Sequence, residues 1–443
     1  MMGWVAIAQA PAVQEIFRPQ VVRPLTGGLN AIPLFNSNSP ELVLTEGILL
    51  STFPPRGMRH PSAHLNYRFQ GEFAAFLHHI ADAPGAQDDR TFYLGFLLGN
   101  PGPRPATVTL RQGASFLTQP DAPFLALPSA VPNPLGWVYS GPGSRLTDFL
   151  LRGGHQPLAP QTLTIPPGET RVLLNQPIPT RRLGITRNAR SVLLRLHSDQ
   201  AVYAASLGLF ATVTPDGHEK PPSLSRWRQL LQEGHLAGPR DLAPTPLDAP
   251  AGTFRYGRVS GVALGTRWRA VLTDPQQDTL AIPPPGGALS YGISLLPRGR
   301  LGTGQDQTAP MLVRYPDTAY RTHGNYTVHY SLVLPLVNRQ SQTRQVVLGL
   351  ESPLKTDRPE GGLRFWQPPA PQVFFRGTVR VRYDDDQGLP RVRDTHLVLR
   401  RGQMLEPLVE MRMAPGQRRW VQVSLLYPPD ASPPQVLTLL TRP

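Results

Sequence analysis

From Pro310 to Glu351 the chain reads PMLVRYPDTAYRTHGNYTVHYSLVLPLVNRQSQTRQVVLGLE. Residues 326–336 are mostly β-branched, aromatic or apolar, and a second such run, 345–350, follows a polar break. This pattern predicts a strand, a turn and a strand. The stretch TFYLGFLLGNPGPRPATVTL, residues 91–110, has the same pattern, with Asn100-Pro101-Gly102 at the predicted turn of a hairpin. Two copies of one unit predict two β modules.

Composition supports an all-β fold. The chain has 443 residues, of which 52 are proline and 40 are glycine, so few windows long enough for a helix lack a helix breaker. Its length suits two or three domains. We predict two β-sandwich-like modules, residues 21–215 and 252–443, joined by a proline-rich connection over residues 216–251.

Three Pro-Gly corners punctuate the predicted strands. Residues 163–175 read LTIPPGETRVLLN, residues 280–296 read LAIPPPGGALSYGISLL, and residues 411–426 read MRMAPGQRRWVQVSLL. In each, an apolar edge meets a Pro-Gly turn and a strand follows. Such corners are common in β-sandwiches.

One helix is predicted, over residues 224–233 in the connection. Ser223 is a suitable N-cap, and Gly234 stands where helices often end in left-handed geometry. The segment 141–144, Gly-Pro-Gly-Ser, is predicted to be a loop. Residues 71–80 match both a helix and a strand pattern, and we favour the strand.

The N-terminus, MMGWVAIAQA, ends in small residues at the spacing that a signal peptidase reads, behind a short apolar run. We therefore predict that residues 1–20 hold the remnant of a signal peptide and an extended segment, and that the protein is exported to the periplasm or cell envelope. The alternative is the frayed terminus of a cytosolic protein. No apolar run approaches the roughly 18 residues of a membrane-spanning helix. The chain has no cysteine, which excludes disulfides and thiolate metal sites.

The formal net charge is +14 and comes mostly from arginine. The charge is dispersed, whereas nucleic-acid-binding proteins concentrate it on one face, so no nucleic acid is expected as a partner. The densest cluster comprises Arg181, Arg182, Arg187, Arg190 and Arg195. It is either a solvated basic surface or an anion-binding site, and in the second case an acidic polysaccharide or lipid head group is the expected partner.

Histidine is the residue type to examine for metal binding. His60 and His64 are four residues apart, and His78 and His79 are adjacent. Pro61 keeps His60 and His64 off a common helix face, and adjacent residues point to opposite faces of a strand. These histidines are either metal ligands or structural residues, and no cofactor is expected.

A candidate ligand-binding group lies in the opening stretch. It comprises Tyr315, Asp317, Tyr320, His323, Asn325 and Tyr326. Tyrosine rings suit the faces of sugars, and Asp317 would be one of the two carboxylates that a glycosidase needs, although no second is identified. The alternative is that these residues pack a sandwich corner. No G-x-S-x-G elbow of a serine hydrolase occurs.

Several long phrases resemble a known family. They are FNSNSPELVLTEGILLSTFPP, PSAHLN, LTQPDAPF, YSGPGSR, AGPRDLAPTP, APMLVRYPDTAYRTHGNY and VFFRGTVRVRYDDDQGLP. The chain resembles, from about Val21 to Leu440, an uncharacterised cyanobacterial family, domain of unknown function 3370. The resemblance implies a secreted, β-rich protein and supplies no catalytic or ligand residue.

These observations favour a non-enzymatic extracytoplasmic protein with a binding or structural role. Two alternatives stay open. One is a carbohydrate-active enzyme that uses acids near Asp317, and the other is a metal-dependent hydrolase that uses His60, His64 and His78 or His79.

Overall fold

The chain is almost entirely β-structure, as predicted. The computed structural model describes residues 12–83, 85, 88–250, 252–358 and 360–443. Strands make up 48% of the chain and helices 6%. The helices are α1 (Pro142–Leu151) and α2 (Leu224–Glu233), with short 3₁₀ turns at η1 (Pro61–Ala63) and η2 (Arg181–Leu183). Within the described residues, no helix has the length and apolar character needed to cross a membrane.

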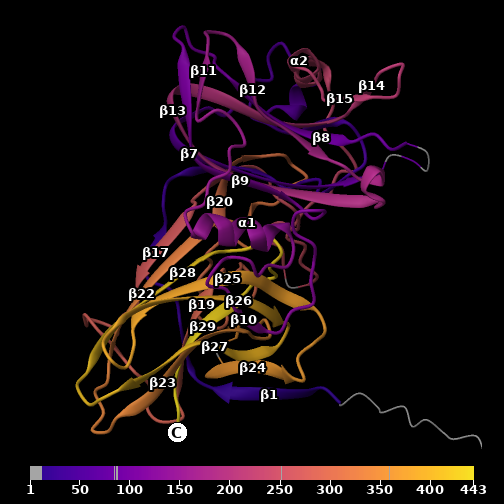
Figure 1. Ribbon diagram of the computed structural model, residues 1–443. Coiled ribbons are helices and arrows are strands. Elements are labelled where there is room, and N and C mark those ends of the chain that lie inside the picture. Colours follow the sequence, from indigo (N-terminus) through magenta and orange to yellow (C-terminus); the bar gives the residue numbers. More distant parts are fainter. Residues whose placement is uncertain (1–11, 84, 86–87, 251, 359) are drawn as a thin grey trace, which may run out of the picture.

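The upper half in Figure 1 is a twelve-stranded sheet folded into two layers. The first layer contains β11 (Thr162–Ile165), β9 (Ala106–Leu117), β13 (Arg187–Phe210), β7 (Phe69–Asp82), β4 (Pro33–Ser37), β5 (Leu42–Val43), β16 (Ser260–Leu264), β20 (Ala309–Arg314) and β21 (Arg321–Thr322). The second contains β12 (Thr170–Ile178), β8 (Phe92–Gly99) and β6 (Gly47–Ser51). β13 passes from the first layer to the second, and its pairing with β7 shifts register between Ser198 and Val202. One apolar core fills the space between the layers.

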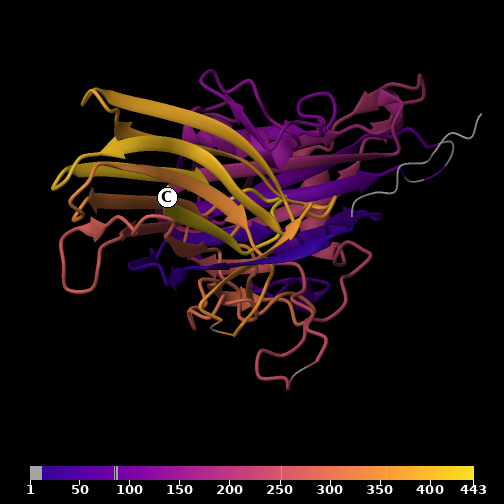
Figure 2. The ribbon, with the colours of Figure 1, turned by 90° about the horizontal axis from the view of Figure 1, so that it is seen from below.

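The lower half is a sandwich of an eight-stranded and a five-stranded sheet. The first contains β10 (Ala130–Pro132), β26 (Pro390–Arg400), β25 (Val373–Asp384), β28 (Arg418–Leu426), β22 (His329–Val337), β17 (Arg267–Val271), β3 (Gly28–Leu29) and β18 (Leu280–Ala281). The second contains β2 (Val21–Arg23), β19 (Ala288–Ile293), β29 (Gln435–Thr441), β23 (Arg344–Ser352) and β27 (Gln403–Met413). Figure 2 shows strands of this half as superposed layers. Two small pairs complete the fold: β1 (Gln14–Pro19) with β24 (Gly362–Gln367), and β14 (Thr212–Val213) with β15 (Glu219–Lys220).

Strand pairing crosses the division that the sequence predicted. β2, β3 and β10 come from the N-terminal part of the chain and pair in the lower half, with β19, β17 and β26. In the reverse direction, β16 and β20 come from the C-terminal part and extend the first layer of the upper half beside β4. β21 pairs with β20 and lies there as well, so these six strands lie outside the module that their sequence position predicted. Backbone hydrogen bonds form between any two strands that the fold brings together, and strands that are consecutive in the sequence are neighbours only about two-thirds of the time.

The two turn-linked strand pairs are arches and not hairpins. β8 and β9 do not pair with each other; β8 pairs with β12 and β9 with β11, in opposite layers. In the lower half, β22 pairs with β28 and β23 with β27, again in opposite layers. The predicted hairpin over residues 91–110 is therefore wrong, although both strands and the turn exist. A buried strand–turn–strand pattern is the same for a hairpin and for an arch that joins two sheets, so sequence alone did not separate them.

A buried asparagine holds each arch in the same way. Asn100 is 2% exposed, and its side-chain nitrogen donates to the carbonyls of Arg104 and Ile165, at 2.7 and 2.9 Å. Its side-chain oxygen accepts from the Gly102 amide at 2.9 Å.

Asn338 repeats these three bonds at the second arch. It is fully buried, donates to the carbonyls of Gln342 and Met413 at 2.9 and 2.8 Å, and accepts from the Gln340 amide at 2.9 Å. In both arches the distant carbonyl, on Ile165 or Met413, lies at the start of a Pro-Gly corner. The two halves therefore share one arch-and-corner unit.

The three Pro-Gly corners are confirmed as joints between strands, and each one crosses between the two layers of its half. They link β11 to β12, β18 to β19, and β27 to β28. Gly168, Gly286 and Gly416 have φ of 69°, 72° and 73° at these corners. A residue with a Cβ is strained in this left-handed region, whereas glycine adopts it readily.

The helix prediction was right for α2 and incomplete elsewhere. α2 spans the predicted residues, and the Ser223 hydroxyl accepts from the Arg226 amide as an N-cap does. Gly234 is extended, with φ −78°, and not left-handed. A Cβ there would lie 2.4 Å from the Leu230 carbonyl oxygen, so close approach explains the glycine. The predicted loop 141–144 is the start of α1, because Pro142 occupies the first turn, where proline is tolerated.

We expect Asn100→Ala and Asn338→Ala each to destabilise the protein by about 2 kcal/mol, because each leaves one buried carbonyl, one part-buried carbonyl and one part-buried amide without their partner. Urea denaturation followed by tryptophan fluorescence measures the change. Gln232→Ala is the control, since Gln232 is exposed on α2 and its loss should matter by less than about 0.5 kcal/mol. Asparagine variants as stable as the Gln232→Ala control would show that the two asparagine side chains do not stabilise the arches.

Candidate functional site

The six residues of the predicted ligand-binding group do not share one site. Tyr315 is 1% exposed; its hydroxyl donates to the Ala63 carbonyl at 2.8 Å and accepts from the Ser51 amide at 3.0 Å. Asn325 is also buried, and its side chain bonds to four neighbours, including the Gln307 carbonyl and the Tyr330 hydroxyl. Both side chains are occupied within the fold, as the packing alternative predicted.

Asp317 and Tyr320 are each covered by an arginine. Arg240 donates to both carboxylate oxygens of Asp317, at 2.8 and 2.9 Å. The Arg314 guanidinium lies 3.9 Å from the centre of the Tyr320 ring. A carboxylate held in such a bidentate pair stays charged and directed at its partner. This geometry gives no support to Asp317 as the acid of a glycosidase.

His323 and Tyr326 line a cleft of about 960 Å³ where the two halves of the molecule meet. Its walls come from the loops after β4 and β23, the connection before β16, the β26–β27 turn and the segment before β29. Five cationic side chains and two carboxylates line it, an excess of three positive charges: Arg240, Arg255, Arg258, Lys355 and Arg401, with Glu41 and Asp241.

Only part of this charge is neutralised. Arg258 bridges Glu41 and Asp241, and Arg240 pairs with Asp317 behind the wall. Among the described residues, Arg255, Lys355 and Arg401 have no carboxylate within 4 Å. Three cations therefore face the cleft without a counter-ion from the protein's described part.

Three polar atoms of the cleft wall are buried without a hydrogen-bond partner. They are the side-chain oxygen of Asn38, Nη1 of Arg240 and Nδ1 of His323. Burial lowers the pKa of His323 to about 3, so its ring is neutral. Buried polar groups in native proteins are nearly always bonded. These three atoms therefore mark the wall of the cleft as incompletely bonded within the protein.

Aromatic rings form part of the same wall. The Tyr256 ring lies 4.6 Å from that of His323, and the Lys355 ammonium lies 5.4 Å from its centre. The Tyr256 hydroxyl donates to the Arg298 carbonyl at 2.6 Å, and burial raises the pKa of Tyr256 to about 12. Tyr326 and Phe374 add two further rings. Flat apolar faces beside cations suit a ligand that carries both a ring face and negative charge.

Glu41 connects the cleft to a buried histidine of β7. Its carboxylate contacts His78 Nε2 at 3.5 Å, and the hydrogen bond from His78 lowers the pKa of Glu41 to about 2. Burial alone would lower the pKa of His78, but Glu41 outweighs it and raises that pKa. Glu41 is thus ionised at neutral pH and has no proton to donate as a general acid.

The four histidines examined for metal binding lie in separate environments. The His60 ring stacks on His235 at 3.5 Å, whereas His64 Nδ1 contacts the Ser51 hydroxyl at 2.8 Å. His78 Nδ1 contacts the Ser191 hydroxyl, at 2.7 Å, and His79 lies between the Ser37 hydroxyl and the Pro40 carbonyl. In the part of the chain that the structure describes, no three His, Asp or Glu side chains are grouped as metal ligands.

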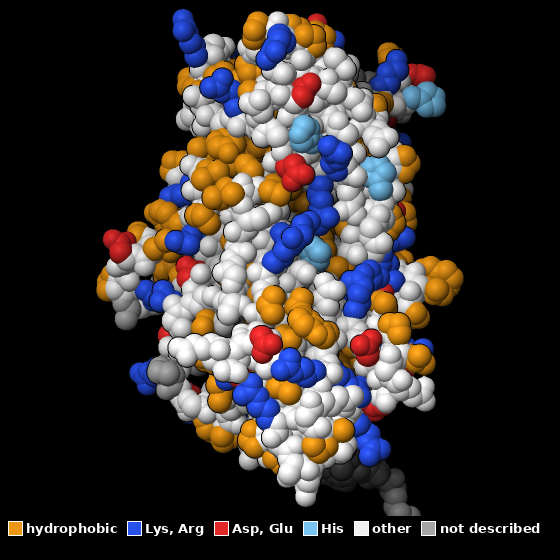
Figure 3. All heavy atoms as spheres, turned by 90° about the vertical axis from the view of Figure 1, so that its left-hand side faces the viewer, with side chains coloured by type: hydrophobic (Ala, Val, Ile, Leu, Met, Phe, Trp, Pro, Cys, Tyr) orange, Lys and Arg blue, Asp and Glu red, His pale blue; other side chains and the backbone are white. Residues whose placement is uncertain are grey.

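The predicted arginine cluster is spread over the upper half. Arg182 pairs with Asp89 and Glu219, and Arg187 pairs with Asp82. Arg190 is buried and donates to the Pro177 carbonyl and the Ser115 hydroxyl, and burial lowers its pKa to about 10. Arg181 belongs to η2. Arg195 lies near another arginine, Arg267. Figure 3 shows that Lys and Arg side chains follow one another down the middle of one side of the molecule.

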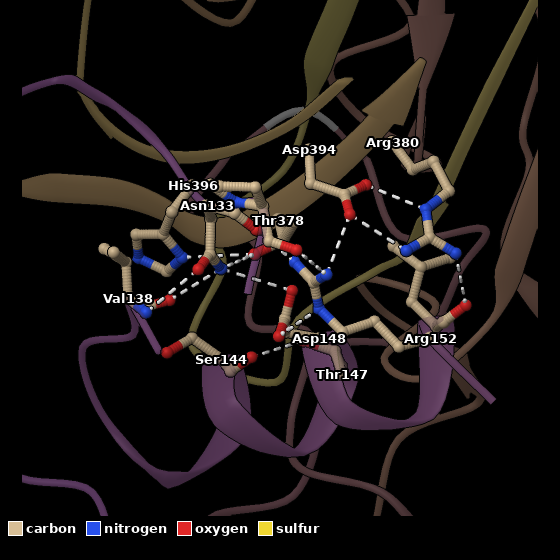
Figure 4. Close-up of polar contacts among 12 residues, drawn as sticks. Asn133, Val138, Ser144, Thr147, Asp148, Arg152, Thr378, Arg380, Asp394 and His396 are labelled. Atoms are coloured by element: carbon tan, nitrogen blue, oxygen red, sulfur yellow. Dashed lines mark hydrogen bonds and ion pairs between the residues drawn. The ribbon is translucent and has the colours of Figure 1, made fainter. Parts of the chain in front are cut away.

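A second polar cluster, at the junction of α1 with β25 and β26, braces the two halves (Figure 4). Asp394 accepts from Arg380 at 2.8 and 2.9 Å and from Arg152 at 2.9 Å, while Arg152 also pairs with Asp148. Asn133, 1% exposed, donates to Asp148 and Thr378. Both carboxylates are buried and held by arginines, so this cluster is structural.

Of the predicted ligand-binding group, His323 and Tyr326 line the cleft, and the other residues of its lining were not among the predicted site residues. Arg255, Lys355 and Arg401 stand in three loops that are far apart in the chain. The AGPRDLAPTP phrase contains Arg240, Asp241 and Leu242 of the wall, and it was the one available sequence signal for this part of the cleft.

We expect Asp394→Ala to cost about 3 kcal/mol of stability, because it leaves Arg152 and Arg380 partly buried without their shared carboxylate. Asp278→Ala is the matched control: Asp278 pairs with Arg418 at 3.5 Å, but both side chains are well exposed, so the loss should stay below about 1 kcal/mol. Thermal denaturation of the two variants compares them directly. Equal losses would show that the cluster at α1 contributes no more than a surface pair.

Comparisons with known proteins identify a family but no function. Among solved structures, the coconut allergen cocosin shares 10% identity over 83% of this chain and 76% of its own, with a TM-score of 0.11, a likeness too low to bear on fold or function. No curated protein matches the chain. The family model described as "Protein of unknown function (DUF3370)" matches residues 20–441. The chain therefore belongs to this family of proteins of unknown function.

Proposed function

We propose that the protein is a non-enzymatic binding protein of the cell envelope whose cleft between the two halves holds an anionic glycan. One observation carries the proposal. Arg255, Lys355 and Arg401 converge on the cleft without carboxylate partners, in a wall that also contains unpartnered atoms of Asn38 and His323.

The size and chemistry of the cleft favour a sugar ligand. Ligand sites in proteins commonly enclose about 300 to 1,000 Å³, and this cleft falls in that range. A glycan offers ring faces to Tyr256 and Phe374, and carboxylate or sulfate groups to the cations. A lipid head group would use the cations but would leave the aromatic walls unexplained, so the lipid is the weaker alternative.

The location is part of the proposal. The segment MMGWVAIAQA, which supported a leader, lies outside the described residues, so this part rests on the sequence pattern and the family resemblance. In fractions of the producing cells we expect the mature protein in the periplasm or envelope, with its N-terminus cut. Full-length protein that keeps Met1 in the cytosol would contradict export.

For the cleft, we expect binding to oligogalacturonate, which carries one carboxylate on each sugar, and none to neutral dextran fragments of the same length. Arg255→Gln with Arg401→Gln should weaken binding by about tenfold or more, because two charge-assisted contacts are lost. Raising the salt concentration should weaken it further, since screening shortens the reach of exposed charges. Calorimetric titration measures each affinity.

Arg68→Gln serves as the control for these variants, because Arg68 is exposed on the upper half and does not line the cleft. If the double variant bound as tightly as this control, the cleft would not be the glycan site. Preference for vesicles of phosphatidylglycerol over oligogalacturonate would favour the lipid alternative. Release of shorter fragments from the oligomer would favour the carbohydrate-active enzyme.

A further inference from the structure

A second basic site lies where the first layer of the upper half meets β17 of the lower half. Arg111 on β9, Arg195 on β13 and Arg267 at the start of β17 line a small pocket of about 140 Å³, with Thr266 between the halves. Glu72 is the single carboxylate in its lining and is itself exposed. None of these residues lines the cleft that holds the proposed glycan.

Two more arginines continue the site along the outer face of the eight-stranded sheet. Arg269 follows Arg267 by two residues on β17 and therefore points to the same face. His329 is the register partner of Arg267 on β22. Arg382 on β25 lies near them. Burial is the main cause that lowers the pKa of His329 to about 4, and four nearby arginines lower it further: Arg195, Arg267, Arg269 and Arg382.

These arginines have little to bind within the protein. In the described chain, neither Arg111, Arg267, Arg269 nor Arg382 makes a side-chain hydrogen bond or an ion pair, and Arg195 donates only to the Gln112 side chain, at 2.7 Å. Some well exposed arginines, such as Arg187 and Arg442, have a carboxylate partner, whereas single exposed arginines such as Arg68 have none in the part of the chain that the structure describes. What distinguishes this site is that several unpaired arginines lie together. Several arginine side chains therefore lie close together here without an ion pair to a described residue that would neutralise their charge.

The positive charges of this site repel one another. Burial, and then the nearby Arg267, lower the pKa of Arg195. Both ring nitrogens of His329 are buried without a partner, although one of them must carry a proton. A bound anion would relieve the repulsion.

We propose that this pocket binds a tetrahedral oxyanion, a sulfate or phosphate group, between Arg111, Arg195 and Arg267. The guanidinium group forms paired hydrogen bonds with such anions. Three arginines that approach from three strands match an anion with oxygens in several directions better than a planar carboxylate. The pocket has room for such a group and a water, since one water takes about 30 Å³.

Calorimetric titration of the full chain with inorganic sulfate and inorganic phosphate tests this site, with acetate as the planar anion. We expect sulfate or phosphate to bind and acetate to bind at least about tenfold more weakly. Arg111→Gln with Arg267→Gln should reduce the affinity by about tenfold or more. Because neither side chain bonds to the protein, the double variant should fold, with an unchanged or higher thermal midpoint without anion.

Two controls separate this site from the cleft and from general charge. Arg68→Gln should bind sulfate like the unaltered chain, and the double variant Arg255→Gln, Arg401→Gln should keep the sulfate binding that the Arg111, Arg267 variant loses. Competition by a sulfated dextran fragment would support a glycan as the source of the group, and competition by vesicles of phosphatidic acid would support a lipid. No binding of either anion, or equal binding by the Arg111, Arg267 variant and the Arg68 control, would overturn the proposal.

Discussion

The buried amide side chains of Asn100 and Asn338 are the contacts on which both halves of the molecule depend. Each joins three points of the backbone: its own turn twice, and a strand end that begins a Pro-Gly corner. An arch between two sheets leaves backbone groups unpaired inside the fold, and an unpaired buried group costs about 1 to 3 kcal/mol. An asparagine can satisfy a donor and two acceptors at once, and no apolar residue of similar size can. The same solution in both halves explains why each half has two layers.

The exchange of strands turns these two sandwiches into one frame. β16 and β20 extend the upper sheet, while β2, β3 and β10 add to sheets of the lower half, so separating the halves would break main-chain pairing as well as side-chain contacts. The first layer of the upper half is apolar on both faces, since Phe76 and Leu193 face α1 across a second core. The loops that form the cleft are therefore anchored at both ends to sheets fixed relative to each other. A preformed cleft binds a ligand without the loss of conformational entropy that would be needed to order its walls.

The sequence predicted those features that depend on residues within one short stretch of the chain, and it did not predict those that depend on contacts between distant residues. The N-cap at Ser223 and the apolar face with Trp227 are local, so α2 was predicted to the residue. The continuous burial of β7 reflects a sheet covered on both faces, and it removes the alternation that marks a strand, which explains the ambiguity over residues 71–80. The arches, the exchanged strands and the grouping of Arg255, Lys355 and Arg401 depend on contacts between distant residues. No pattern within a single window carries that information.

The distribution of arginine partners separates structural charge from charge that faces outward. In the cluster at α1, Asp394 holds Arg152 and Arg380, and in the cleft wall Asp317 holds Arg240. Arg190 is held instead by the Pro177 carbonyl and the Ser115 hydroxyl. In the cleft Arg255 and Arg401, and in the second basic site Arg111, Arg195 and Arg267, have no carboxylate within 4 Å in the described chain, although the chain contains 30 acidic residues. Clustered cations destabilise a folded chain through repulsion. A rigid frame can hold the cations together despite this repulsion, and the simplest way to offset the repulsion is to bind a ligand of opposite charge.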